Sequence, residues 1–246
     1  MKKLLKLTWV ELKLFMREPI TMIFTFALPL ISLFVLSEVF GTTVDTDAFL
    51  GVAPTNYYIS AYMGLVIAAV GLISLPVHIA AYKEKGVLRR FRSSSISAKN
   101  LLSAQLIVTF VIVLVCCIIL FIAAKLAYDV MLPNSPGLLI IAFIPSVLCF
   151  GAIGVLLGAV LPTARSAQGV GLLLFFVMFF VGGSGPPFDV MSPVLQRVGD
   201  ATPLKWAVIS MQDVWLGFGW NWTAFGIVIG ILIAAALLAI RFFRWD

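Results

Sequence analysis

The sequence predicts an all-α membrane protein with six transmembrane helices, on the basis of its composition and its long apolar runs. Hydrophobic residues make up 62% of the 246 residues and charged residues only 11%, whereas a soluble domain is about half apolar. A helix that crosses the hydrocarbon core needs about 20 mostly apolar residues. Each such stretch is expected to be helical, because backbone polar groups in lipid must be satisfied internally. Six stretches qualify: 20–40, 57–81, 102–127, 138–161, 168–184 and 222–243.

The distribution of the basic residues predicts the orientation of these spans. Six spans place both ends of the chain on the same side of the membrane. All but three of the 17 lysines and arginines fall on that side, the exceptions being Lys125, Arg197 and Lys205. Because basic residues are enriched in cytoplasmic segments, we expect a multi-pass protein of the cell membrane with both termini cytoplasmic. The net charge of +6 is then explained by topology and does not indicate a nucleic-acid partner.

The first segment, residues 1–18, is too polar for a span. On a helical wheel its five cations fall within an arc of about 100°, with Trp9 among the apolar residues opposite. This pattern predicts an amphipathic helix in the headgroup plane, with its cations towards anionic lipid. It is either a simple basic anchor or an elbow helix that also braces a cytoplasmic partner. The residues expected to serve the elbow are Trp9, Lys13 and Arg17.

The segment between spans 2 and 3, residues 82–100, has five cations before Ser97 and a single acid, Glu84. On a short helix the cations cover one half, and Val87, Leu88 and Phe91 cluster on the other. A loop that only fixes topology needs no apolar face, whereas a loop that docks into a protein groove does. A glutamate on that face needs a partner, because an unpaired buried charge is costly. The alternative is a solvated basic loop with an incidental apolar stripe.

The segment before the last span, residues 182–221, alternates prolines and glycines with short apolar pieces. It is too polar for a span and too apolar for a free loop, which predicts re-entrant helical segments. Irregular backbone at membrane depth requires shielding by protein or a water-filled cavity. The alternative is an ordinary external loop with interfacial aromatic residues. Four of the six tryptophans suit such an interface belt: Trp206, Trp215, Trp220 and Trp222.

Small residues within the spans indicate where helices approach closely. Gly154 and Gly158 in the fourth span, and Gly226 and Gly230 in the sixth, have the spacing typical of close helix packing. His78 is the only histidine. Since one histidine makes no metal cluster, we expect it to have a structural or interfacial role.

The motifs that would carry enzymatic chemistry are missing from the sequence. There is no G-x-x-x-x-G-K-[ST] phosphate loop, no H-E-x-x-H and no G-x-S-x-G. The three cysteines, Cys116, Cys117 and Cys149, lie inside apolar runs, where they fit as small buried hydrophobes rather than metal ligands. We therefore expect no catalytic site, no metal site and no cofactor in this chain.

One family resemblance adds to this reading. The sequence "YKEKGVLRRFRSSSISAKNLLSAQL", which begins at Tyr82, resembles the segment after the second helix in type-2 permease subunits of ATP-binding-cassette (ABC) exporters. The family has a glutamate, a glycine, a leucine with basic residues and a short polar stretch in that order. Val87 stands where threonine is usual, and Ser95 where proline is common. The resemblance implies a cytoplasmic coupling helix that transmits ATPase motion through Glu84, Gly86, Val87, Leu88, Arg89, Arg90 and Phe91.

Residues 182–221 resemble the same family more specifically. The family has a Gly/Ser and Pro-Phe turn, then a proline followed by leucine and glutamine, then a P-L-x-x-x-V segment before the final helix. In the family, the region that corresponds to residues 182–221 forms the outer lid over the translocation path. The resemblance therefore implies an extracellular lid that includes Pro186, Pro187, Phe188, Pro193 and Pro203.

The resemblance as a whole implies the permease subunit of a bacterial ABC exporter of the antibiotic, drug or lipid type. ATP and Mg²⁺ would be bound by separate ATPase subunits, and a second permease, identical or paralogous, would complete the translocation path. An apolar and aromatic cavity between the two permeases suits an amphipathic substrate such as an antibiotic, a lipid or a lipopeptide, with efflux and antibiotic resistance as the outcome. The alternative from another class is an ATP-independent membrane channel or a membrane scaffold subunit.

Overall fold

The computed structural model describes residues 2–17, 19–40, 49–86 and 98–242, and within these ranges it contains helices and no strands. Six helical segments are long and apolar enough to cross a membrane, which confirms the predicted fold class. They are Pro19–Phe40 (α2, η1 and α3), Pro54–Glu84 (α4, η2 and α5), Leu101–Tyr128 (within α7, Ala98–Tyr128), Pro136–Val160 (α8), Ala164–Val181 (α9) and Trp222–Phe242 (α12).

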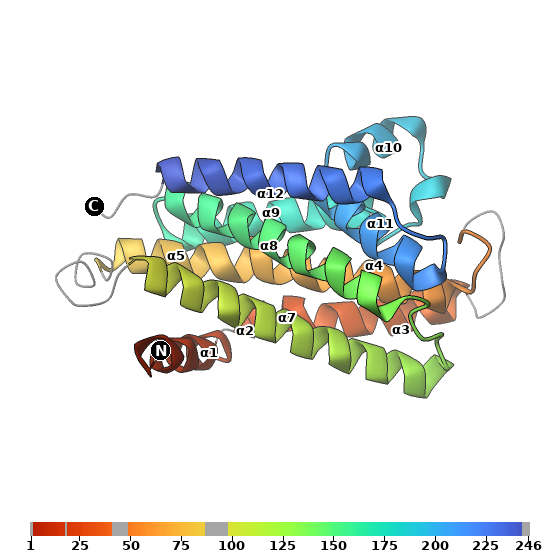
Figure 1. Cartoon of the computed structure of the whole chain (residues 1–246), viewed down its shortest axis with the longest axis horizontal. Coiled ribbons are helices and arrows are strands. Elements are labelled where there is room, and N and C mark those ends of the chain that lie inside the picture. Colours follow the sequence, from red (N-terminus) through yellow and green to blue (C-terminus); the bar gives the residue numbers. More distant parts are fainter. Residues whose placement is uncertain (1, 18, 41–48, 87–97, 243–246) are drawn as a thin grey trace.

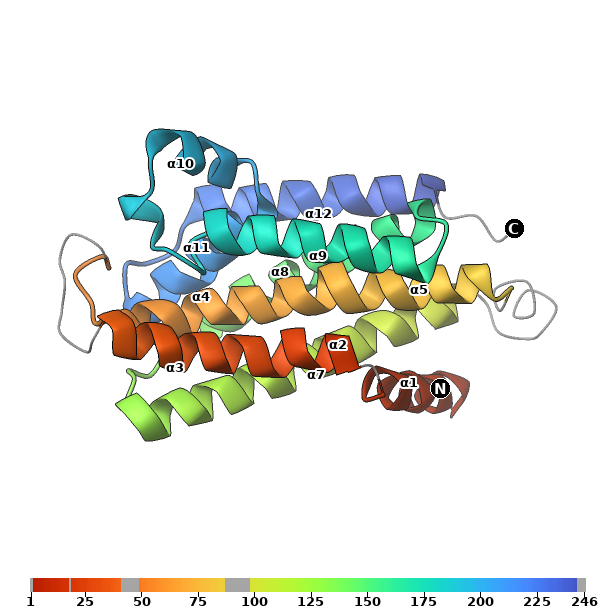
Figure 2. The ribbon, with the colours of Figure 1, turned by 180° about the vertical axis from the view of Figure 1, so that it is seen from behind.

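The spans run side by side along the long axis of the molecule (Figures 1 and 2). The helix α1 (Lys2–Phe15) lies at the same end of the bundle as the C-terminal end of α12 and the end of α5 (Figure 1). We call this the termini end. The short helix α10 (Pro193–Asp200) lies at the opposite end, which we call the lid end. The described ends of the chain, at Lys2 and Phe242, therefore lie at one end of the bundle, and the cytoplasmic location of that end stays a prediction.

The second span occupies the centre of the bundle. In its apolar stretch 94% of the residues are buried inside the protein, against 22% in α12. Its three parts are α4 (Pro54–Ala69), η2 (Val70–Ser74) and α5 (Leu75–Glu84). The other spans surround it and leave many apolar side chains exposed, which is the surface expected of a protein whose solvent is a bilayer.

Glycines allow the fourth span to press against the second. A Cβ atom added to Gly154 would lie 2.2 Å from the carbonyl oxygen of Gly71, and one added to Gly158 would lie 2.6 Å from Cβ of Ile79. No side chain larger than hydrogen fits at either position without moving backbone. The close packing predicted for this pair of glycines is confirmed.

The matching prediction for Gly226 and Gly230 is wrong. A Cβ atom at either position would have no neighbour within 4 Å. The buried face of α12 is formed instead by Ala224, Val228, Ala235 and Ala239. Equal spacing in the sequence thus corresponds to a packed face in α8 and an open face in α12.

A wide π-helical turn precedes a proline in each of the first two spans. The turn η1 (Ile23–Ala27) comes before Pro29, and η2 comes before Pro76. Proline has no N–H, and its ring clashes with the carbonyl four residues earlier, so a wider turn relieves the conflict. For Pro29 that carbonyl belongs to Thr25, and it accepts a hydrogen bond from the thiol of Cys116 at 2.8 Å. This bond gives one of the buried cysteines a structural role.

The segment before the last span contains two helices and a short 3₁₀ turn: α10, α11 (Pro203–Leu216) and η3 (Phe188–Val190). Pro193 and Pro203 stand at the first position of their helices, where the missing N–H costs nothing. One face of α11 is buried against α4, α8 and α12, with Trp215 among the residues that bury it. The alternation of helices and breakers matches the expectation, and the depth of these helices in the membrane stays a prediction.

Candidate functional site

The end of α5 is bonded to two other spans at once. Lys83 Nζ donates hydrogen bonds to the backbone carbonyls of Ala159, at 2.7 Å, and Leu161, at 3.3 Å, where α8 ends. Glu84 Oε2 accepts a hydrogen bond from the backbone N–H of Ala164, at 3.0 Å, where α9 begins. The last carbonyls and first N–H groups of a helix lack partners within it. The Lys83 side chain therefore lies at the C-terminal, negative end of the α8 dipole, and the Glu84 side chain lies at the N-terminal, positive end of the α9 dipole.

These contacts bear on the coupling residues predicted from the sequence. Glu84 was expected to need a partner, and it has one on α9. Gly86 adopts a left-handed conformation, with φ +64°, directly after α5, and its N–H bonds to the carbonyl of Lys83 at 3.1 Å. Glycine tolerates this conformation without strain, so it ends the helix here. The remaining predicted coupling residues lie outside the described residues: Val87, Leu88, Arg89, Arg90 and Phe91.

A second contact at the termini end joins α1 to the spans through Glu11, which is only 2% exposed. Its Oε1 accepts a hydrogen bond from the hydroxyl of Tyr82 on α5, and its Oε2 accepts one from Nε2 of Gln105 on α7, both at 2.6 Å. We call these three residues the Glu11 latch. The sequence interpretation missed it, because Glu11 was not placed among the elbow residues.

Burial and the contacts of the latch act in opposite directions on the pKa of Glu11. Burial raises the pKa of Glu11 above its ordinary value, and the hydrogen bond from Tyr82, the charge of His78 and the hydrogen bond from Gln105 partly oppose that change. His78 is buried one helical turn before Tyr82, which fits the structural role expected for it.

The residues predicted for the elbow lie on the other side of α1. Trp9, Lys13 and Arg17 are exposed, and the Lys13 ammonium lies 5.2 Å from the centroid of the Trp9 ring. Helix α1 therefore holds the bundle with Glu11 and the buried Phe15, and presents an aromatic and basic face outward. That face is available to lipid headgroups or to a partner protein.

At the lid end, the turn after α9 is fastened to the start of α4. The hydroxyl of Tyr58 donates to the carbonyl of Gly185 at 3.1 Å, and the Phe188 N–H donates to the hydroxyl of Tyr57 at 3.4 Å. Gln212 of α11 donates to the carbonyl of Tyr57 at 3.2 Å. Two segments that are distant from α4 in the sequence, the turn after α9 and the helix α11, therefore converge on one turn of α4.

A buried lysine connects α10 and α11 at the lid end. Lys205, at the start of α11, is 8% exposed and forms an ion pair with Asp200 at the end of α10. Its ammonium lies 3.6 Å from the centroid of the Phe188 ring and 4.9 Å from that of Trp206, which is cation–π geometry. Of the residues predicted for the lid, Phe188 makes these contacts, while Pro187 is buried next to it.

The two ends of the bundle present different chemical groups. Across the described ranges, no cluster of three or more His, Cys, Asp or Glu side chains is placed to hold a metal ion. The termini end offers the side chains of Lys83 and Glu84 at helix ends, and at the lid end Lys205 lies against the rings of Phe188 and Trp206.

Comparison with known proteins identifies the family. The family model for the ABC-2 type transporter matches residues 2–216, which include α1, the coupling segment and both lid helices. No curated protein matches the chain. Because the match covers most of the chain, and six apolar helices accompany it, the protein belongs to the ABC-2 type transporter family, as a multi-pass permease component of an ABC transporter.

Proposed function

We propose that this permease exports an amphipathic substrate, such as an antibiotic, a lipid or a lipopeptide, across a bacterial cell membrane. A separate ATPase, which binds ATP and Mg²⁺, docks at the cytoplasmic termini end. A second permease subunit, identical or paralogous, completes the path. The outcome of such export would be efflux of the substrate and, for an antibiotic, resistance.

The observation that carries the proposal is the attachment of the end of α5 to α8 and α9. Lys83 and Glu84 bond to the backbone of both helices directly before the predicted coupling helix. Force applied by an ATPase to the segment after Glu84 would therefore move three spans together. Because α5 is pressed against α8 at Gly154 and Gly158, little of this motion would be lost to sliding between helices.

The second span leads from this attachment to the lid. Between Glu84 and Tyr57 it extends about 40 Å, at 1.5 Å per residue, and it is the most buried of the six spans. Tyr57 and Tyr58 at its far end hold the turn that includes Gly185 and Phe188. A displacement of the second span at the ATPase side would therefore change the contacts of Tyr57 and Tyr58 that keep the lid closed.

The same geometry supports the proposal of a second permease. The second span fills the centre of the bundle, so the path for a substrate is expected to lie between this chain and its partner rather than through it. Apolar and aromatic side chains dominate the outward faces of the spans, which suits a substrate with a large apolar part.

The test measures ATP hydrolysis coupled to transport after co-expression with a candidate ATPase. Glu84→Ala removes the acceptor for the Ala164 N–H, and Arg89→Glu reverses a charge expected at the ATPase surface. Both are expected to lower co-purification of the ATPase or stimulation of hydrolysis by substrate. Lys85→Ala, a change at an exposed neighbour of Glu84, serves as the matched control.

A third variant separates two reasons for failure at Glu84. Glu84→Gln keeps an oxygen that accepts from Ala164 but removes the charge. Recovery of coupling in Glu84→Gln would place the effect in the bond to α9, whereas continued loss would place it in recognition by the ATPase. If Glu84→Ala and Arg89→Glu both keep full association and coupling, the docking role is wrong, and an ATP-independent channel or scaffold becomes the better explanation.

A further inference from the structure

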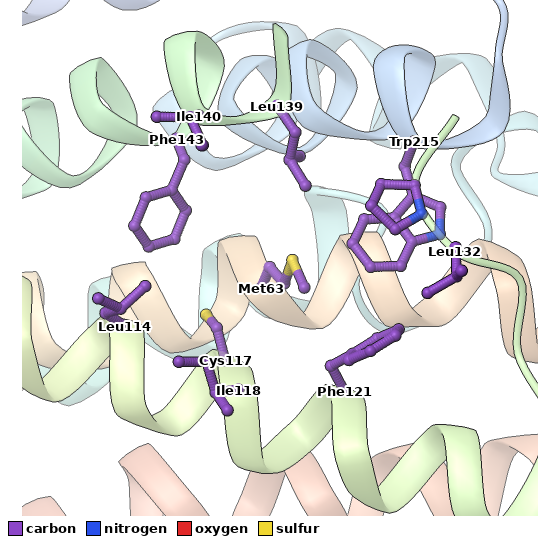
Figure 3. Close-up of a pocket in the computed structure, with 11 residues that line it drawn as sticks. Met63, Leu114, Cys117, Ile118, Phe121, Leu132, Leu139, Ile140, Phe143 and Trp215 are labelled. Carbon is purple, nitrogen blue, oxygen red and sulfur yellow. The ribbon is translucent and has the colours of Figure 1, made fainter. Parts of the chain in front are cut away.

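A cavity of about 350 Å³ lies between α4, α7, α8 and α11, apart from both the lid contacts and the coupling segment (Figure 3). Its back wall includes Met63 and Trp215, which are buried, and its sides include Phe121 of α7 and Phe143 of α8. This volume is within the range of small-molecule sites, which is about 300–1,000 Å³.

The cavity is apolar throughout and open on one side. Every side chain that lines it is aliphatic or aromatic or belongs to a methionine, a cysteine or a proline. Three of these residues are strongly exposed: Ile118 of α7, Ile140 of α8 and Leu132 of the connecting loop. Because α7 and α8 are membrane spans, the open side faces the bilayer. Hydrocarbon is therefore the material available to fill it.

The position of the cavity along α7 matches the depth of one leaflet. Phe121 stands seven residues before the end of α7 at Tyr128, and Leu114 stands 14 residues before it. At 1.5 Å per residue, the cavity extends from about 10 to about 20 Å below the lid end of this helix. The hydrocarbon core is about 30 Å thick, so an acyl chain of the leaflet at the lid end passes this depth.

Charged groups lie directly above the cavity on the same face of α7. Lys125 follows Phe121 by four residues, which places the two side chains one above the other. Lys125 Nζ forms an ion pair with Asp129 at 2.6 Å and donates to the carbonyl of Val130 at 3.0 Å. The loop that carries these partners continues to Leu132, which lines the cavity. An apolar slot with an ammonium group above it is complementary to an acyl chain joined to a phosphate.

We propose that this cavity is a binding site for one phospholipid of the leaflet at the lid end. One acyl chain occupies the apolar slot, and the phosphate lies near Lys125. The site is separate from the path between two permeases and does not depend on the proposed export function or on an ATPase.

The test uses the full chain in lipid nanodiscs and a phospholipid that carries a photoactivatable diazirine in the middle of one acyl chain. After illumination, mass spectrometry locates the labelled residues. The expected labels concentrate on 114–121 of α7 and 139–143 of α8. Ile118→Trp fills the open side and is expected to reduce this labelling several-fold, whereas Ile119→Trp is expected to leave it unchanged.

The two variants form a matched pair. Ile118 and Ile119 are adjacent in α7 and are 48% and 41% exposed, but only Ile118 lines the cavity. Ile140→Trp and Ile141→Trp provide the same comparison on α8 if an α7 variant does not fold. Lys125→Gln is expected to weaken labelling at low probe concentration without changing its location.

Three outcomes would overturn the proposal. Labels spread evenly over the exposed faces of α7, α8 and α12 would show ordinary contact with surrounding lipid. Unchanged labelling in the folded Ile118→Trp and Ile140→Trp variants would place the lipid outside the cavity. Efficient disulfide formation between two copies of an Ile118→Cys variant would show that a second copy of the chain covers this face.

Discussion

At the termini end the helices are joined by the side chains of Lys83, Glu84 and Glu11, which bond to backbone and side-chain groups, whereas at the lid end they are joined mainly by tyrosine hydroxyls and packed aromatic rings. Lys83 and Glu84 reach the ends of α8 and α9 close to water, while Tyr58 and its neighbours are fully buried. Charged contacts near water are weak enough to be exchanged for contacts with a partner. Buried ring contacts must be broken together. This difference fits the proposed function, in which the ATPase acts on the termini end and the lid end opens in response.

The largest expected effect comes from breaking the connection between the two ends. In Gly154→Leu the new side chain meets the backbone oxygen of Gly71, which cannot move aside by changing a rotamer. Overpacking of this kind costs about 3 kcal/mol of unfolding free energy. Gly226→Leu, where a Cβ atom has open space, should change it by no more than about 0.5 kcal/mol. Denaturant unfolding of both purified variants measures the difference, and equal stability would contradict the close contact between α8 and the second span at Gly154.

An intermediate effect is expected at the Glu11 latch. Glu11→Ala leaves the Tyr82 hydroxyl and the Gln105 amide without their acceptor, which costs about 2 kcal/mol. In the native protein the raised pKa of Glu11 means that the folded state holds the proton more tightly than the unfolded state. Stability from this group is therefore fully present below its ordinary pKa of 4.5 and is lost as pH rises through the raised value.

Glu11→Gln separates this effect from other titrations in the protein. The variant keeps a polar group in the latch but has no proton to lose. Melting temperatures of both proteins, taken from pH 4.5 upward, should differ in slope, with the native protein losing more stability as pH rises. Parallel curves would mean that burial against α5 and α7 does not raise the pKa of Glu11 in the folded state.

The smallest expected effect is at the lid end and compares two stacked tyrosines of α4. Tyr58 and Tyr62 are both fully buried, and their ring centroids are 5.4 Å apart. Tyr58→Phe removes a hydrogen bond to Gly185 and should cost about 1 kcal/mol. The hydroxyl of Tyr62 has no hydrogen-bond partner within the described residues, so Tyr62→Phe should be neutral or stabilising. Thermal unfolding of the two variants checks the order, and a reversed order would remove the assigned role of Tyr58 in holding the lid.

Much of the fold could be predicted because its signals are local. The six spans follow from runs of apolar residues, and the lid helices follow from prolines such as Pro193 and Pro203 at their starts. The bonds of the termini end could not be predicted, since Glu11 meets Tyr82 and Gln105, which lie 71 and 94 residues away. A helical wheel compares the faces of one helix and does not show which face another helix will cover. The same limit explains why Gly154 and Gly226 looked alike in the sequence.

The order of Lys83 and Glu84 has a consequence for how α5 can move. Adjacent residues of a helix point about 100° apart. Twisting α5 about its axis by that angle would bring the ammonium towards the N–H groups of α9, or the carboxylate towards the carbonyls of α8, and both encounters repel. The pair therefore resists torque while permitting α5 to tilt or shift together with α8 and α9. The second span can therefore tilt with its neighbours, while its rotation about its own axis is opposed.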